Sequence, residues 1–187
     1  MKSKPMIIAS FVFMLLIGVV CGGVLLPAIQ GTNTILEPEI EANVNVSVIR
    51  DGEVIYQESN HNTLMNIGAE YIETLMTNAT YATTGEVKYI SLSSNASAEN
   101  AVNTQIAEEI TTGGLARAAG TVSDEGNGNY AVEHEFTATA THNNVQLTGL
   151  NWKTGNTDNN LFAADQFTSV NLIADDKITV NWTITIS

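Results

Sequence analysis

The stretch formed by residues 178–186 alternates between apolar and polar side chains without interruption. Threonine or asparagine occupies every second position. The apolar positions between them are Ile178, Val180, Trp182, Ile184 and Ile186. Because successive side chains of a β-strand point to opposite faces of a sheet, this pattern predicts a strand with one buried face and one solvent-facing face.

The same alternation recurs through most of the chain after residue 42. Residues 43–57 predict a β-hairpin, because Asp51-Gly52 is typical of a type I′ turn and follows an alternating segment with Val44, Val46 and Val48 on one face. Further extended segments are expected at residues 87–93, 115–122, 130–140, 145–152 and 162–172. In the segment at 145–152 the apolar phase changes near Gly149, which indicates a β-bulge.

Four regions depart from the strand pattern. Residues 63–76 carry apolar side chains at helical spacing after Asn62 or Thr63, so we expect one amphipathic helix with either residue as its N-cap. A short helical turn is expected at residues 105–109. Residues 124–129 and the pair Asp175-Asp176 read as polar turns.

This order of elements predicts a mainly β fold. About eight short strands at hairpin spacing indicate an antiparallel β-sandwich or jelly-roll-like domain over residues 43–187, with one amphipathic helix. An N-terminal hydrophobic helix is expected to precede the domain. Residues 1–30 are expected to form a transmembrane anchor or signal segment, and residues 31–42 an extended acidic linker.

The N-terminal hydrophobic run spans residues 6–29 without a charged residue. A helix of this length reaches about 36 Å, which is enough to cross a bilayer. Lys2 and Lys4 precede the run and acidic residues follow it, so the N-terminus is expected inside the cell and the bulk of the chain outside. Cleavage of the run as a signal peptide would instead release the domain.

Composition narrows the classes of partner. The chain has seven basic and 20 acidic residues, and Lys2 and Lys4 lie before the hydrophobic run, so the part after residue 30 has a net charge of −15. Such an acidic domain repels phosphate groups, which argues against nucleic-acid binding. The single cysteine, Cys21, lies inside the hydrophobic run, so the exported part has no disulfide or thiolate metal site.

No recognisable catalytic set occurs. The three histidines are His61, His134 and His142, and no Gly-x-Ser-x-Gly motif is present. His134 falls on an apolar strand face, which favours a core histidine. Acidic pairs occur at 108–109, 133/135 and 175–176. Glu133 and Glu135 share the outward face of one predicted strand, which favours a solvated edge over glycosidase carboxylates. The chain is therefore expected not to be an enzyme and to need no cofactor.

Calcium is the one metal that the sequence suggests. Asp124, Asn127 and Asn129 lie in one oxygen-rich turn, and Asp158 lies in another. Oxygen ligands of this type suit Ca²⁺, although neither turn has the spacing of an EF-hand loop. Ordinary glycine- and asparagine-rich hairpin turns explain the same residues.

Four sequons of the form Asn-x-Ser/Thr are present, at Asn45, Asn78, Asn95 and Asn181. They are candidate glycosylation sites of an exported surface. Chance accounts for about as many in a chain with this much asparagine, serine and threonine. Asn45 and Asn181 fall on the polar face of their predicted strands, where a glycan would not disturb the core.

From residue 62 onward the order of short motifs resembles a β-rich domain of phage tail-fibre and minor virion structural proteins and of related archaeal surface proteins. The motifs are Asn-Thr-Leu-Met-Asn-Ile-Gly at 62–68, Tyr-Ile-Ser-Leu-Ser at 89–93, Gly-Leu-Ala-Arg at 114–117 after Glu109, Phe-Thr-Ala at 136–138, Gly-Leu at 149–150, Leu-Phe-Ala at 161–163 and the strand at 178–184. The resemblance implies a structural or receptor-contacting module, with Glu109 and Arg117 as a candidate structural ion pair.

Two functional hypotheses follow. The first is an exported structural protein, a subunit of a cell-surface filament, a surface layer or a virion or envelope assembly. It would contact the membrane through residues 6–29 and bind copies of itself or other surface proteins, and its last strand and linker would suit strand addition. The second is a monomeric membrane-anchored adhesin or glycan-binding module, for which Trp152 is the best placed stacking ring.

Overall fold

The computed structural model describes residues 40–77, 85–155, 157 and 159–186, with the backbone alone at 73–77. The predicted anchor at 1–30 lies outside these residues, as do residues 31–39. The strands are β1 (Ile40–Arg50), β2 (Glu53–His61), β3 (Thr63–Leu64), β4 (Tyr89–Ser93), β5 (Ala118–Ala119), β6 (Thr121–Gly126), β7 (Asn129–Thr137), β8 (His142–Asn151), β9 (Leu161–Leu172) and β10 (Lys177–Ile186), and the helix is α2 (Asn66–Thr77).

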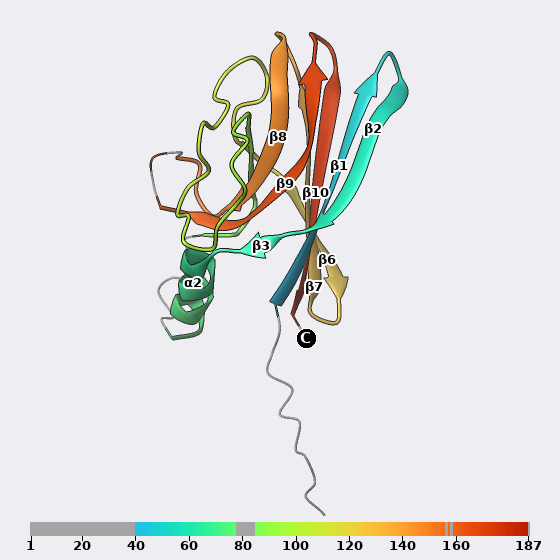
Figure 1. Ribbon diagram of the computed structural model, residues 1–187. Helices are drawn as coiled ribbons and strands as arrows, with labels where there is room; N and C mark the ends of the chain where they lie inside the picture. The colour runs from blue at the N-terminus through green and yellow to red at the C-terminus, as the bar shows by residue number, and fades with distance from the viewer. Residues whose placement is uncertain (1–39, 78–84, 156, 158, 187) are drawn as a thin grey trace, which may run out of the picture. The chain divides into compact units, whose positions relative to one another are not determined.

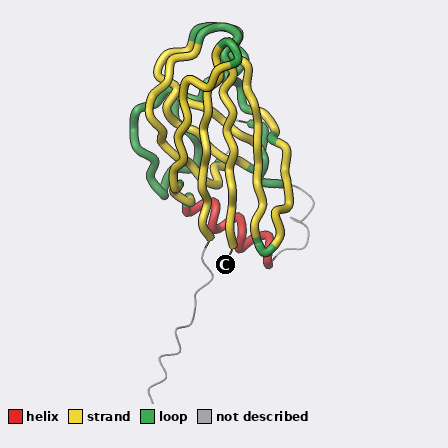
Figure 2. Tube along the Cα trace, turned by 90° about the vertical axis from the view of Figure 1, so that its right-hand side faces the viewer, coloured by secondary structure: helices red, strands yellow, loops and turns green. Residues whose placement is uncertain are grey.

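The strands form two five-stranded sheets in which all pairings are antiparallel (Figure 1). Sheet A has the order β2-β1-β10-β7-β6, and sheet B has the order β3-β9-β8-β4-β5. The predicted mainly β architecture with one helix is thus confirmed for the part of the chain that the structure describes. Figure 2 shows α2 at one end of the strands.

One hydrophobic core lies between the two sheets. Sheet A contributes the inward positions of the alternating strands, and sheet B contributes the apolar residues of β4, β8 and β9. The fully buried core side chains include Val44, Val48, Phe136, Val180 and Trp182 from sheet A, and Ile90, Leu92, Leu150 and Leu172 from sheet B. Each buried Val, Leu, Ile or Phe side chain stabilises the fold by about 1.5–3 kcal/mol.

The alternation of the last strand is reproduced in the structure. Ile178, Val180, Trp182 and Ile184 of β10 are buried, whereas Ile186 at the end of the strand is half exposed. β10 lies between β1 and β7, so both of its edges are already paired within the chain. The strand is therefore not free to pair with a neighbouring subunit, and strand addition through it is not supported.

The first hairpin follows its turn signal. Asp51 and Gly52 have φ values of 51° and 82°, the left-handed conformation that a type I′ turn requires at both central positions. The strand before this turn begins at Ile40, earlier than predicted, because residues 40–42 continue the pairing of β1 with β10. The extended linker predicted to end at residue 42 therefore overlaps the domain by three residues.

Several other boundaries differ from the sequence predictions. The helix begins at Asn66, because Thr63 and Leu64 pair with β9 and the Met65 N–H donates to the carbonyl of Phe162. The helical turn predicted at 105–109 is wrong: these residues form irregular turns that end in a bridge between Glu109 and Ser93. Residues 161–172 form one continuous strand.

The bulge expected near Gly149 has a counterpart in β8. The register with β9 shifts between Leu150 and Asn151, and it shifts twice more nearer the start of the strand.

None of the described helices is long and apolar enough to cross a membrane.

Candidate functional site

The most enclosed ion pair among the described residues joins Arg117 and Glu109. The guanidinium donates from Nε to Glu109 Oε1 at 2.9 Å and from Nη2 to Oε2 at 2.6 Å, so the contact is bidentate. The two side chains are only 4% and 5% exposed. The pair implied by the sequence motifs is therefore present, and it is buried.

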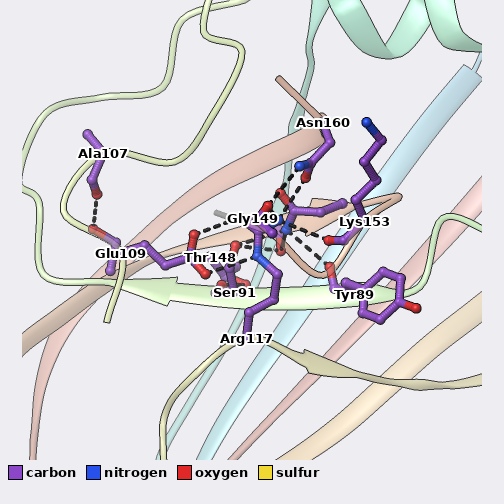
Figure 3. Close-up of polar contacts among 12 residues, drawn as sticks. Tyr89, Ser91, Ala107, Glu109, Arg117, Thr148, Gly149, Lys153 and Asn160 are labelled. Carbon is purple, nitrogen blue, oxygen red and sulfur yellow. Dashed lines mark hydrogen bonds and ion pairs between the residues drawn. The ribbon is translucent and has the colours of Figure 1, made fainter. Parts of the chain in front are cut away.

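The third guanidinium nitrogen fixes the segment that follows β8. Arg117 Nη1 donates to the carbonyls of Lys153 at 3.0 Å and Gly155 at 2.8 Å, and to Asn160 Oδ1 at 2.7 Å (Figure 3). Asn160 in turn donates to the Gly155 carbonyl at 2.9 Å. With all of its nitrogens engaged, Arg117 holds the connection between β8 and β9 against the chain that leads into β5, which is a structural role.

A second polar group lies between β4 and β8, close to Arg117 in Figure 3. Asn151 Nδ2 donates to Ser91 Oγ at 2.9 Å, and Thr148 Oγ1 donates to the Ser91 carbonyl at 3.1 Å. All three residues are buried. Among the described residues no hydrogen bond joins Ser91 to a histidine; His142 contacts the Gly113 carbonyl, and His134 packs edge-on against Phe136. The geometry supplies no activated serine nucleophile there.

An acidic seam joins the two sheets where β2 meets β9. We define it as Tyr56, Glu58 and Asn60 of β2 with Asp165 of β9. Asn60 Nδ2 donates to Glu58 Oε1 at 2.7 Å, to Asp165 Oδ2 at 3.2 Å and to the Gln166 carbonyl at 3.2 Å. Glu58 Oε2 accepts from the Thr168 N–H at 2.9 Å and from the Tyr56 hydroxyl. A single amide thus connects two carboxyl groups.

The pKa values of the two carboxyl groups in the acidic seam are shifted in opposite directions. Burial raises the pKa of Asp165 to about 7; the hydrogen bond from Asn60 opposes this shift, and the charges of Glu99 and Glu58 add to it. Burial also acts to raise the pKa of Glu58, but hydrogen bonds from Tyr56, Asn60 and Thr168 outweigh it and lower the pKa to about 2. Asp165 is not among the residues predicted from the sequence; an acidic residue within the apolar run 161–167 was the available signal.

The candidate calcium ligands are used in turn formation. Asp124 Oδ1 accepts from the Gly126 N–H at 2.9 Å, and Asn129 Nδ2 donates to the Gly126 carbonyl at 3.2 Å. Asn127 has a φ of 53° and forms the hairpin turn with Gly128. Asp158 lies outside the described residues. Within the described part of the chain, no group of three or more His, Cys, Asp or Glu side chains is placed to hold a metal ion.

The acidic pairs noted in the sequence are separated by the fold. Glu109 is buried against Arg117, whereas Glu108 is exposed. Asp176 is buried and accepts a bidentate contact from Arg50, with Nη2 to Oδ2 at 2.6 Å, which lowers the pKa of Asp176. Asp176 lies at a turn, as predicted from the sequence, whereas its ion pair with Arg50 was not predicted.

The carboxylates of β7 face outward, as predicted for a solvated strand face. Glu135 pairs with Lys177 at 2.7 Å, and both side chains are nearly half exposed. Glu133 accepts from Asn181 Nδ2 at 2.8 Å.

The ring of Trp152, the predicted stacking platform, is already covered on one face by another aromatic ring. Trp152 stacks on Tyr71 of α2 with ring centroids 4.5 Å apart and an interplanar angle of 13°. The Tyr71 hydroxyl donates to the Gly85 carbonyl. Trp152 is half-buried and Trp182 is fully buried, so the described residues present neither tryptophan as an open platform for a sugar ring.

No family model, no curated protein and no solved structure matches the chain. The resemblance to tail-fibre and surface proteins therefore stays a prediction.

Proposed function

We propose that the chain is an exported structural protein, a subunit of a cell-surface filament, a surface layer or a virion or envelope assembly, and that it is not an enzyme. Its two sheets would form a β-sandwich held at the membrane by residues 6–29. The uncharged run, the preceding Lys2 and Lys4, and the cysteine-free acidic domain support export. β1 and β10 pair from Ile40 with Ile186, so the chain enters the domain beside its last strand.

The observation that carries the assembly part of the proposal is the open edge of sheet A. All six residues of β6 are exposed, and the strand pairs only with β7. The edge strands of sheet B, β3 and β5, have two residues each. The second half of β2, which contains Glu58 and Asn60, is hydrogen-bonded to β9 through the acidic seam. Of the described sheet edges, β6 is therefore the one best suited to pair with another chain.

Charge sets the conditions for such pairing. Asp124 and Glu125 lie on β6 within a domain of net charge −15. Repulsion between two copies would oppose contact at low ionic strength, and 0.1 M salt largely screens exposed charges that are more than about 10 Å apart. Exposed Val122, at 47%, offers apolar area on the same strand. We therefore expect association to strengthen as the salt concentration rises.

A second candidate is a monomeric membrane-anchored adhesin. The observation that favours it is the pairing of both edges of β10 within the chain, which leaves the domain self-contained. Under this alternative the β6 edge stays unpaired, and the acidic residues on it prevent aggregation.

The test compares Val122→Asp on β6 with Val54→Asp on β2, using full-length protein extracted from native membranes. Both valines are exposed and lie on opposite edge strands of sheet A, so the substitutions match in chemistry. In sedimentation at high salt, the unaltered protein and Val54→Asp should form assemblies, and Val122→Asp should not. Monomers for the unaltered protein would overturn the assembly proposal in favour of the adhesin.

A further inference from the structure

We infer that Asn95 is the site at which the folded domain accepts an N-linked glycan. This inference rests on the proposed export of the chain, because glycan transfer to asparagine takes place on exported proteins. Three of the four sequons, at Asn45, Asn95 and Asn181, fall on described residues, and the structure distinguishes them. Asn78 lies outside the described residues.

The sequons at Asn45 and Asn181 lie inside paired strands. Asn45 of β1 and Asn181 of β10 are direct cross-strand partners, and each strand is hydrogen-bonded on both sides. The middle residues of these sequons are Val46 and Trp182, which are 1% and 0% exposed. An enzyme that bends either sequon into its active site would have to break two ladders and pull a core side chain into water.

The extended backbone also separates the groups that the transferring enzyme must recognise together. In a strand, side chains two residues apart are about 7 Å from each other. Asn45 and Ser47 are in this arrangement, as are Asn181 and Thr183. Asn181 Nδ2, the atom that would carry the glycan, already donates to Glu133 Oε2 at 2.8 Å. Asn45 and Asn181 could therefore accept a glycan only before their strands pair.

The sequon at Asn95 has the opposite properties. It lies in the irregular segment after β4, and its middle residue Ala96 and its hydroxyl residue Ser97 are both exposed. The Ser97 N–H donates to Asn95 Oδ1 at 2.7 Å, so the chain is already bent between the two residues. Asn95 Nδ2 makes no hydrogen bond with the other described residues, although the side chain is half-buried.

The segment is held in place without the use of this amide nitrogen. The Asn95 N–H donates to Ser93 Oγ at 2.9 Å, Gln146 donates to the Ser94 carbonyl at 2.9 Å, and Gln166 donates to the Ala96 carbonyl at 3.0 Å. A glycan on Nδ2 would leave these contacts intact. Modification at Asn95 is therefore compatible with the fold.

The transfer requires a lipid-linked sugar pyrophosphate as donor. A bond forms between Asn95 Nδ2 and the anomeric carbon of the sugar, and the bond from that carbon to the phosphate oxygen breaks. The lipid pyrophosphate leaves with the electron pair, and the amide nitrogen loses one proton to a base of the transferring enzyme. No oxidation or reduction takes place.

The experiment is glycopeptide mass spectrometry on the full chain purified from its native surface, with Ser97→Ala and Ser47→Ala as matched variants. Each substitution removes the hydroxyl of one sequon and keeps its asparagine. We expect glycan mass on the Asn95 peptide of the unaltered chain, its loss in Ser97→Ala and its retention in Ser47→Ala. The Asn45 and Asn181 peptides should be unmodified.

The outcomes separate this inference from the proposed function. An exported chain with an unmodified Asn95 peptide, or with glycan at Asn45 or Asn181 in its place, would overturn the inference alone. A chain found only in the cytoplasm would overturn both. Fractionation of the same cells, with mass analysis of the N-terminus, decides between these results.

Discussion

Arg117 shows at the residue scale how a buried charge constrains the fold. Its bidentate contact with Glu109 leaves both side chains almost without solvent. Desolvation offsets much of the Coulomb attraction in such a pair, so the net stabilisation of the intact pair is small. Removal of one partner is a different matter, because the remaining charge stays buried without compensation.

We therefore expect Arg117→Met to lower the free energy of unfolding by about 3–5 kcal/mol. Lys177→Met is the matched control, because its ion pair with Glu135 is 47% and 43% exposed. An exposed pair contributes about 0–1 kcal/mol. Urea unfolding of both variants measures the two effects. Equal losses in the two variants would contradict the structural role of Arg117.

The acidic seam predicts a pH dependence of stability. The pKa of Asp165 is about 7 in the folded protein and about 3.8 without the fold. The folded state therefore binds more protons between these values, and its stability falls as the pH rises through this interval. The loss reaches at most about 4 kcal/mol, at about 1.4 kcal/mol for each pKa unit. At lower pH, Glu58 has the opposite effect: because its pKa is lowered from 4.5 to about 2 in the folded protein, stability falls as the pH drops through this interval.

Asp165→Asn tests this prediction, since asparagine does not titrate. Thermal unfolding between pH 4.5 and pH 7.5 should show a decline for the unaltered protein and a flatter profile for the variant. Glu135→Gln, an exposed carboxylate on β7, serves as the control and should keep the decline. A decline of the same size in Asp165→Asn would assign the titration to another group.

At the element scale, the contact between α2 and β9 decides the position of the helix. Gly68 is buried on α2, and a Cβ at this position would lie 2.4 Å from the Phe162 carbonyl oxygen of β9. The helix thus packs directly on the strand backbone, where a side chain would not fit. Helix propensity and packing make opposite predictions here, because alanine is the better helix former by about 1 kcal/mol.

We expect packing to prevail. Gly68→Ala should lower the free energy of unfolding by about 1–3 kcal/mol, the usual cost of an overpacked contact. Ala69→Gly on the exposed side of α2 is the control and should cost about 1 kcal/mol through propensity alone. Chemical denaturation of both variants provides the comparison. A more stable Gly68→Ala protein would show that the helix moves away from β9 at little cost.

At the scale of the whole molecule, closure of the domain limits the ways in which copies can associate. β1 and β10 pair along their length, although Ile40 and Ile186 stand at opposite ends of the described sequence. This pairing occupies the strand that the sequence marks as the most regular. Association between chains is therefore expected at the β6 edge. Because Val122 and Val54 are both exposed, neither aspartate variant should alter unfolding, and a difference in sedimentation would report on assembly alone.

The sequence by itself determined the local features of the protein. Strict alternation placed Val180 and Trp182 inside and Thr179 and Asn181 outside, because the two faces of a strand follow from a period of two. The Asp51-Gly52 turn was equally readable, because left-handed φ values restrict the residue types at those positions. The existence of the helix followed from its apolar spacing.

Only the tertiary structure decided which distant residues meet. Arg50 and Asp176 are 126 positions apart, and their contact depends on the closing of the β9–β10 turn against the end of β1. The first residue of α2 depended on the pairing of Thr63 and Leu64 with β9. The raised pKa of Asp165 depended on the approach of β2 to β9. Local patterns carry no record of such contacts, because these arise from packing between segments far apart in the chain.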